Sequence, residues 1–167
     1  MSYHEHKEQS PKAVNCAVVT ISDSRTVQTD ESGAFIKKRL TGNGHGVLSY
    51  ALLKNDPAAI EKHIQDLLGK DSLQVIITTG GTGVSQRDVT VETLAPLLAK
   101  KFDGFGELFR YLTYQDIGAT SVMSRAMAGV ASGKVVICLP GSLGAVTLAM
   151  DKIILPEMGH MVREATR

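Results

Sequence analysis

The chain has 167 residues, which is long enough for one domain with a single buried core. Its apolar share of 43% and charged share of 21% exclude an intrinsically disordered protein. Lys and Arg (18) nearly balance Asp and Glu (17), without a basic stripe, and the start has no apolar segment typical of a secretion signal. We therefore expect a cytoplasmic protein without a nucleic-acid or membrane partner, because no later run is long enough to span a bilayer.

In chain order, the polar residues 1–12 are predicted to be a flexible N-terminal tail, followed by a domain over residues 13–167. Short apolar runs rich in β-branched residues predict strands at 14–21, 47–53, 73–78 and 134–139. Helical spacing of apolar residues predicts helices at 31–40, 57–68, 89–98, 105–112 and 143–155. Pro156 is expected to end the last helix, and residues 113–133 show no clear pattern.

This alternation of strands and helices predicts an α/β fold, a three-layer α-β-α single domain with a mostly parallel sheet. In such sheets ligands bind beyond the carboxyl ends of the strands. Cys16 and Cys138 stand among apolar neighbours, which is typical of buried, reduced thiols. The histidines lack metal-ligating spacing, so a histidine metal site is not expected.

The strongest functional signal is a loop rich in glycine and threonine that follows the third predicted strand and precedes a helix. Phosphate binding requires backbone N–H groups that side chains do not shield, free hydroxyls and often a helix N-terminus. A plain glycine-rich turn is the alternative, but this density of glycine and threonine exceeds what a turn needs. The proposed phosphate-binding residues are Thr78, Thr79, Gly80, Gly81, Thr82 and Gly83.

The loop matches neither GxxxxGK[ST], because it has no lysine, nor GxGxxG, because the last glycine is missing. A carboxylate beside a phosphate site usually acts through a divalent metal, because otherwise it repels the ligand. Asp88 follows the loop, and Asp56 stands where the second strand gives way to a helix. Both are candidate Mg²⁺ ligands, although each could instead be a helix cap, and for Asp56 before Pro57 the cap is the stronger interpretation.

Further polar residues follow the first and last predicted strands, so they should reach the same edge of the sheet. Arg25, Arg87 and Arg125 could bind phosphate oxygens, although single arginines are more often solvated or ion-paired. Glu107 could contact the ligand or be an ordinary acid of a first helical turn. The remaining candidates are Ser22, Asp23, Pro140, Gly141 and Ser142.

Several segments together resemble the MoaB/Mog family of molybdenum cofactor biosynthesis proteins. They are TISDSRT (20–26), TTGGTGVSQRDVT (78–90), FDGFGELFR (102–110), SR (124–125) and LPGSLGAV (139–146). The resemblance spans nearly the whole chain after Ala13. The motif at 78–90 is shared with related molybdenum-insertion and competence-damage-type proteins, and the short chain favours the MoaB/Mog branch.

The resemblance implies a molybdopterin adenylyltransferase, which transfers AMP from Mg-ATP to the terminal phosphate of molybdopterin and releases pyrophosphate. It places the catalytic, Mg²⁺-binding acids at Asp56 and Asp88, and the nucleotide and pterin phosphates along residues 78–83. Ser142 would lie in another loop of the same rim. The family also implies a homo-oligomer, either a trimer or a hexamer.

Two other functions are compatible with the same loop. A molybdopterin-binding or carrier protein would bind the pterin without turnover, and the presence of both acids favours the enzyme over this alternative. A purely structural oligomer with a vestigial loop would bind no nucleotide.

Overall fold

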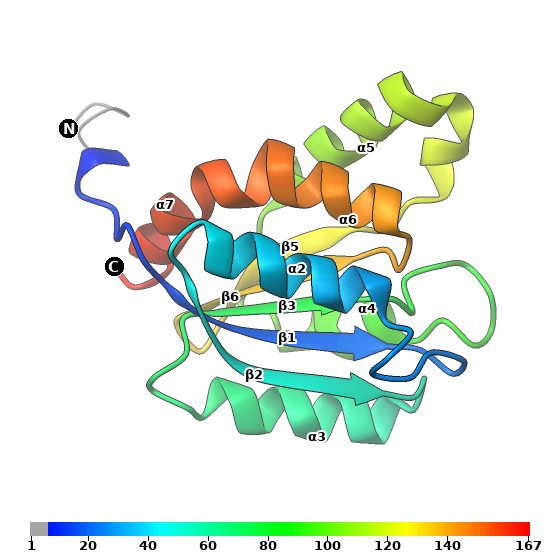
Figure 1. The fold of residues 1–167 in the computed structure, drawn as a ribbon, viewed down its shortest axis with the longest axis horizontal. Coiled ribbons are helices and arrows are strands. Elements are labelled where there is room, and N and C mark those ends of the chain that lie inside the picture. Colours follow the sequence, from blue (N-terminus) through cyan, green and yellow to red (C-terminus); the bar gives the residue numbers. More distant parts are fainter. Residues whose placement is uncertain (1–6) are drawn as a thin grey trace.

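The structure is a computed structural model that describes residues 7–167, and residues 1–6 lie outside the described part. A six-stranded sheet with the order β2-β1-β3-β6-β5-β4 forms its centre (Figure 1). The strands are β1 (Asn15–Ile21), β2 (Gly46–Leu53), β3 (Val75–Thr79), β4 (Lys100–Lys101), β5 (Met127–Ala131) and β6 (Lys134–Leu139). The first four in the sheet order run parallel, whereas β5 pairs antiparallel with both β6 and β4. The prediction of a mostly parallel α/β sheet is therefore confirmed.

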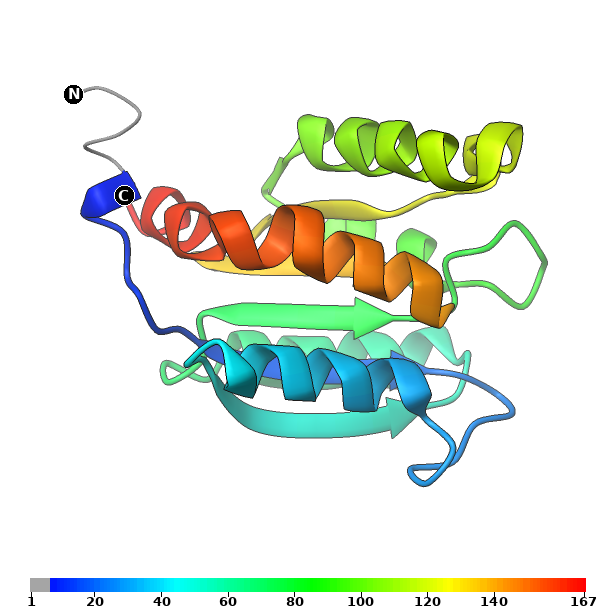
Figure 2. The ribbon, with the colours of Figure 1, turned by 45° about the horizontal axis from the view of Figure 1, so that its top comes forward.

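Helices cover both faces of this sheet. The α-helices are α2 (Glu31–Gly42), α3 (Pro57–Leu68), α4 (Thr90–Leu94), α5 (Asp103–Ile117), α6 (Leu143–Ala149) and α7 (Leu155–Ala165). Because successive strand residues point to opposite faces, Cys16 and Val18 pack with α2, α5, α6 and α7, whereas Ala17 and Val19 pack with α3 and α4. Figure 2 shows α2 and the α6–α7 segment lying across the same face. The three predicted layers are confirmed.

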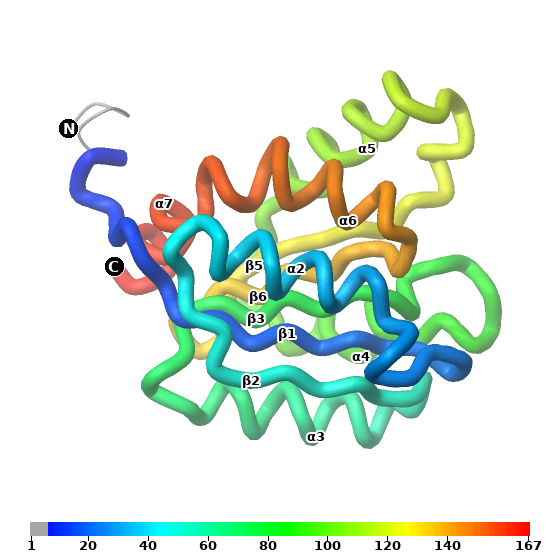
Figure 3. Tube along the Cα trace, viewed as in Figure 1, coloured from blue at the N-terminus to red at the C-terminus, as the bar shows by residue number. Residues whose placement is uncertain are grey.

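The central strands end at nearly the same level, which places their following loops together. Thr20 of β1 is in register with Thr79 of β3, and Thr79 is in register with Leu139 of β6. The Cα trace shows the loops after these strands gathering at one end of the molecule (Figure 3). Any site built from these loops must lie at this carboxyl edge, as expected for a parallel sheet.

The prediction that Pro156 ends the last helix is wrong. A π-helical turn, Met150–Ile154, follows α6, and α7 then runs on from Leu155. Pro156 falls in the first turn of α7, where its missing N–H costs no hydrogen bond. The break in the α-helical register therefore accommodates the proline, and the chain remains helical to Ala165.

Residues 113–133, which show no clear pattern in sequence, contain three elements. They complete α5, form the 3₁₀ helix η2 (Gly118–Met123) and then supply β5. The edge strand β4 was also not predicted, because two exposed lysines carry no apolar alternation. The predicted helix at 89–98 is divided into α4 and a 3₁₀ turn, Ala95–Leu97, which contains Pro96.

Residues 7–12 are the part of the predicted tail that the structure describes, and they contact α7. Lys7 Nζ lies 2.7 Å from Glu157 Oε1, and Arg163 donates a hydrogen bond to Gln9 Oε1 at 3.0 Å. Flexibility of residues 1–6 remains a prediction outside the described residues. None of the helices in residues 7–167 has the length and apolar character needed to cross a membrane.

Both cysteines are buried and free, as the sequence predicts. Burial raises the pKa of Cys16 and of Cys138 to about 12, because the thiolate is poorly solvated in the core. We expect alkylation of the native protein at pH 8 to be about 10³-fold slower than that of a free thiol, since the thiolate is the nucleophile. Ellman's reagent should detect both thiols only after denaturation. Rapid reaction of either thiol in the native state would contradict their burial.

Candidate functional site

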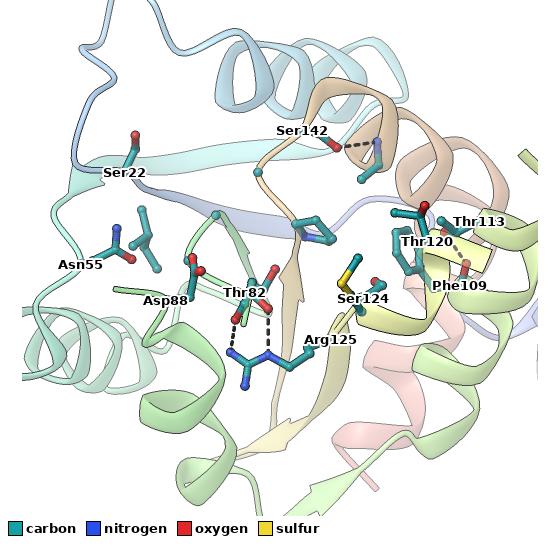
Figure 4. A pocket seen from close by; sticks show the side chains of 18 of the residues that line it. Ser22, Asn55, Thr82, Asp88, Phe109, Thr113, Thr120, Ser124, Arg125 and Ser142 are labelled. Atoms are coloured by element: carbon teal, nitrogen blue, oxygen red, sulfur yellow. Dashed lines mark hydrogen bonds between the residues drawn. The ribbon is translucent and has the colours of Figure 1, made fainter. Parts of the chain in front are cut away.

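A cavity of about 590 Å³ opens at the carboxyl edge of the sheet (Figure 4). It receives residues from the loops after β1, β2, β3 and β6 and from α5 and η2. Its polar wall consists of Ser22, Asp23, Ser24, Asn55, Gly80, Gly81, Thr82, Gly83, Asp88, Arg125, Pro140, Gly141 and Ser142. The structure therefore brings the predicted glycine loop together with predicted residues from both neighbouring loops.

The glycine loop adopts a backbone that requires glycine at its first two positions. Gly80 has φ +97° and Gly81 has φ +67°. A Cβ on Gly80 would lie 2.1 Å from the Ile21 carbonyl oxygen, and one on Gly81 would lie 2.3 Å from Thr90 Oγ1. The loop thus bends sharply against β1 without side chains to shield its backbone from a ligand.

Thr90, the first residue of α4, ties down the carbonyl groups of this bend. Its hydroxyl donates to the Gly80 carbonyl oxygen at 2.9 Å, and its backbone N–H donates to that of Gly81 at the same distance. Gly80 N–H in turn donates to the Leu139 carbonyl oxygen. With these groups paired, the loop keeps a single shape, which favours binding of a ligand to a preformed site.

Arg125 lines the cavity but holds the loop through carbonyl oxygens. Its Nε donates to the Thr82 carbonyl oxygen at 2.9 Å, and its Nη2 donates to the Gly83 carbonyl oxygen. Its Nη1 forms an ion pair with Glu92 of α4. The guanidinium predicted to bind phosphate oxygens is therefore occupied as a brace, and Glu92, which the sequence analysis did not single out, holds it in place.

We expect Arg125→Lys to lower the free energy of unfolding by about 2 kcal/mol, because one ammonium cannot replace three fixed donor directions. Hydrogen exchange should also become faster in the loop at Thr82 and Gly83. Urea unfolding and exchange measurements would check both effects. Arg110→Lys is the matched control, since Arg110 makes one long hydrogen bond of 3.4 Å, to the Ser124 carbonyl oxygen. Equal stability of the two variants would contradict the brace.

The three threonines of the predicted loop separate into two groups. Thr78 and Thr79 end β3 and are fully buried, and their hydroxyls face the carbonyl oxygens of Ile137 (3.5 Å) and Pro140 (2.8 Å). Thr82 lines the cavity. Thr78 therefore lies within the sheet, away from the cavity, because every residue of this central strand is covered on both faces.

The two predicted carboxylates occupy different positions. Asp88 lines the cavity beside Gly83, and its Oδ2 accepts hydrogen bonds from Ser85 N–H (3.1 Å) and Ser85 Oγ (2.6 Å). Asp56 is the N-cap of α3, where its Oδ1 accepts from Ala58 N–H at 3.0 Å. Its neighbour Asn55 lines the cavity instead. The cap alternative therefore describes Asp56 in this structure, whereas Asp88 faces the site.

Asp23 is the second carboxylate of the cavity wall. Its Oδ1 accepts from Asn55 N–H at 3.0 Å, and hydrogen bonds from Asn55 are the main cause that holds the Asp23 pKa below its ordinary value. The charges of Arg87 and Lys54 lower this pKa further. Asp23 is therefore ionised at neutral pH. Asn55 escaped prediction because a single amide before a helix resembles any polar turn.

The other predicted residues form the rim. Ser22 Oγ accepts from Arg25 N–H at 3.0 Å, and Ser142 caps α6 through Ala145 N–H at 3.3 Å. The close approach of Gly141 to Gly80, 3.3 Å from a Cβ on Gly141 to Gly80 Cα, joins the loops after β3 and β6. Glu107 is exposed on α5 and does not line the cavity.

The opposite end of the cavity is more apolar and comes from the segment without a sequence pattern. Phe109, Thr113 and Ile117 of α5 and Met123 of η2 line it. Figure 4 shows Ser22, Asn55 and Asp88 at one end and Phe109, Thr113 and Thr120 at the other. A heterocycle would fit the second end, and charged groups the first, so the cavity suits an amphipathic ligand.

Comparison with known proteins gives one family. A family profile described as "Probable molybdopterin binding domain" matches residues 17–160. The Molybdenum cofactor biosynthesis protein B of Bacillus cereus is 48% identical over 168 residues, covering 100% of this chain and 99% of that protein. The Bacillus subtilis protein of the same name is 44% identical over 165 residues, covering 98% and 97%.

Solved structures agree. A crystal structure of a Molybdenum cofactor biosynthesis protein B has a TM-score of 0.90 and 47% identity, covering 94% of this chain and 98% of that one. The tungsten cofactor synthesizing protein MoaB from Pyrococcus furiosus has a TM-score of 0.85 and 33% identity, covering 95% and 100%. The profile match and these full-length relatives place the chain in the molybdopterin-binding domain family of molybdenum cofactor biosynthesis proteins.

Proposed function

We propose that the protein is a molybdopterin adenylyltransferase, which joins AMP from ATP to the terminal phosphate of molybdopterin. The observation that carries this proposal is the cavity itself, in which an unshielded glycine loop and Asp88 share one wall. Gly80 N–H is paired with the Leu139 carbonyl oxygen, whereas the N–H groups of residues 81–83 have no hydrogen-bond partner within the described residues. Such free N–H groups suit phosphate oxygens. A carboxylate at the same wall suits a phosphate site only when a divalent cation accompanies the ligand.

In this reaction a terminal phosphate oxygen of molybdopterin bonds to the α-phosphorus of ATP. The bond between the α-phosphorus and the bridging oxygen breaks, and its electron pair leaves with pyrophosphate. The protein needs no nucleophile of its own, so its task is to hold two anions in line and stabilise developing charge. The residues assigned to this task are the loop residues 80–83, whose backbone would orient the phosphates, and the rim residues Ser22 and Ser142.

Magnesium fits the oxygen-rich end of the cavity. Asp88 and Asp23 place carboxylates there, and the Asn55 Oδ1 atom is buried without a hydrogen-bond partner in the described part of the chain. Mg²⁺ commonly takes one or two carboxylates, with phosphate and water completing the shell. When bound, it would offset phosphate charge. Asp56, the second acid that the resemblance implies, has one oxygen committed to its helix cap.

The second candidate is a molybdopterin carrier without turnover. The apolar end of the cavity suits the heterocycle of either substrate, so it does not distinguish the two functions, and only the reaction does. Purified protein should be mixed with molybdopterin, ATP and Mg²⁺ and analysed for adenylylated molybdopterin and pyrophosphate. Product formation supports the enzyme, whereas molybdopterin binding without product supports the carrier. Absence of both would contradict the two proposals.

The homo-oligomer, trimer or hexamer, also belongs to this proposal. Exposed apolar side chains on α5, η2 and α6 support a contact between copies of the chain. They are Leu108, Tyr111, Tyr114, Ile117, Val122, Met123 and Leu143. The cytoplasmic location remains a prediction.

A further inference from the structure

The charges lining the cavity do not match the ligands proposed for it. Its charged wall residues are Asp23, Asp88 and Arg125. The guanidinium of Arg125 is committed to Glu92 and to two loop carbonyl oxygens. In residues 7–167, the wall thus presents two carboxylates and one neutralised cation to a polyphosphate. Part of the missing positive charge must come from outside the wall, even when a metal ion accompanies the ligand.

Two cations outside the cavity wall contact Asp23, and we call the end of the cavity at Asp23 its mouth. Lys54 Nζ donates to the Asp23 carbonyl oxygen at 2.6 Å. Arg87 Nη1 lies 3.7 Å from Asp23 Oδ2, too far for a hydrogen bond, and its side chain is 83% exposed. Arg87 belongs to the loop after β3 and Asp23 to the loop after β1, so this ion pair spans two loops that flank the cavity.

The Arg87–Asp23 pair is easily exchanged for a better partner. Exposed ion pairs contribute little to stability, and this one lacks hydrogen-bond geometry. A guanidinium binds phosphate oxygens through two parallel N–H donors, which a separation of 3.7 Å from one oxygen does not use. Separation of Arg87 from Asp23 therefore costs little free energy, and a phosphate at the mouth can accept two charged hydrogen bonds from the guanidinium.

The axis of the cavity indicates which phosphates reach the mouth. The apolar end beside Phe109 and Ile117 suits a heterocycle. Figure 4 shows Thr82 of the glycine loop between Phe109 at that end and Ser22, the neighbour of Asp23, at the other. A nucleoside triphosphate with its base at the apolar end would extend its terminal phosphates toward Asp23. These are the phosphates that leave as pyrophosphate in adenylyl transfer.

We propose that Arg87 leaves Asp23 when substrate binds and holds the terminal phosphates of the nucleotide, becoming a direct contact to the leaving pyrophosphate. This assignment rests on the proposed function. The electron pair of the broken P–O bond passes to the pyrophosphate oxygen, whose charge the guanidinium offsets. Asp23 serves as a resting partner that keeps the arginine at the mouth.

The test uses inorganic pyrophosphate as the probe. EDTA is present to remove divalent metal ions, so that only cationic groups of the protein contribute to binding. Isothermal titration calorimetry would compare wild type with Arg87→Ala, Arg87→Lys and Asp23→Asn. We expect Arg87→Ala to bind pyrophosphate about tenfold more weakly and Arg87→Lys to lie between it and wild type. Asp23→Asn should bind more tightly, because it releases Arg87 and removes a repelling charge while keeping an oxygen acceptor for Asn55 N–H.

Lys62→Ala is the matched control, because Lys62 is a 78% exposed cation on α3 that pairs with Asp66. It should bind pyrophosphate as wild type does. A second comparison with Mg²⁺ present would measure ATP and AMP, and Arg87→Ala should weaken ATP about tenfold while changing AMP by less than about twofold. Equal losses for ATP and AMP would overturn the assignment to terminal phosphates.

The outcomes separate this proposal from the proposed function. Unchanged pyrophosphate affinity in Arg87→Ala, or no pyrophosphate binding by wild type, overturns the role of Arg87 even if adenylylated molybdopterin is formed. If Arg87→Ala weakens pyrophosphate binding but the wild-type protein forms no adenylylated molybdopterin, the phosphate contact is retained and the reaction is rejected. Weaker binding by Asp23→Asn would also overturn the resting-partner role.

Discussion

Asp88→Asn is expected to reduce the rate of adenylyl transfer about 10³-fold while leaving the fold intact. Of the two predicted metal-binding acids, Asp88 is the one that the structure places in the cavity wall, beside Gly83 of the glycine loop. Asparagine keeps the shape and an oxygen that can accept from Ser85, so the local turn should persist. What it removes is the negative charge needed to hold a divalent cation against the phosphates. The measurement is single-turnover formation of adenylylated molybdopterin, with circular dichroism to establish folding.

Asp56→Asn is the matched variant at the second predicted acid. Asparagine caps helices about as well as aspartate, so the variant should keep α3 stable. If Asp56 also reaches the metal through its second oxygen, turnover should fall by a similar factor. If Asp56 only caps α3, activity should be nearly unchanged. Full activity of Asp88→Asn would remove Asp88 from the mechanism whatever the result at Asp56.

Gly80→Ala should produce the largest loss of stability, about 3 kcal/mol or more. The new Cβ would lie 2.1 Å from the Ile21 carbonyl oxygen, and φ at this residue is +97°, which L-amino acids rarely adopt. The loop cannot move away from β1 without losing the hydrogen bond from Gly80 N–H to the Leu139 carbonyl oxygen. Urea unfolding would give the change in free energy, and pyrophosphate affinity should fall with it.

Gly104→Ala provides the control for that measurement. Gly104 lies in the first turn of α5, and nothing lies within 4 Å of a Cβ built there. Alanine should be neutral or stabilise the protein by about 0.5 kcal/mol, because it restricts the unfolded chain and favours the helix. If Gly80→Ala were as stable as Gly104→Ala, the tight approach of the loop to β1 would be wrong.

Much of the candidate site could be predicted because its residues follow strands that are evident in sequence. Ser22, Gly80 and Pro140 each come directly after an apolar run, and parallel strands bring such positions to one edge. The role of Arg125 could not be predicted, because its partners Thr82 and Glu92 are distant in sequence from it. Nor could Glu107 be excluded, because a helical pattern does not say which way an exposed acid faces.

The apolar end of the cavity escaped prediction for a different reason. Phe109 and Ile117 face it from α5, and the following 3₁₀ helix η2 supplies Met123. Helical periodicity predicts which residues of a helix are buried, but not whether they meet core or ligand. The antiparallel β5, with Gly129 and two alanines, has too little apolar alternation to identify it as a strand.

The sequence by itself determined the fold class, the four parallel strands and the loop at 78–83, because these depend on local periodicity and on glycines at adjacent positions. Tertiary structure decided which members of that loop can meet a ligand. Thr78 and Thr79 are buried in β3, whereas the glycines and Thr82 lie at the cavity. Tertiary structure also decided that Arg125 binds loop carbonyl oxygens and that Arg87 pairs with Asp23 at the mouth. Ion-pair partners depend on distances between loops, which no sequence pattern records.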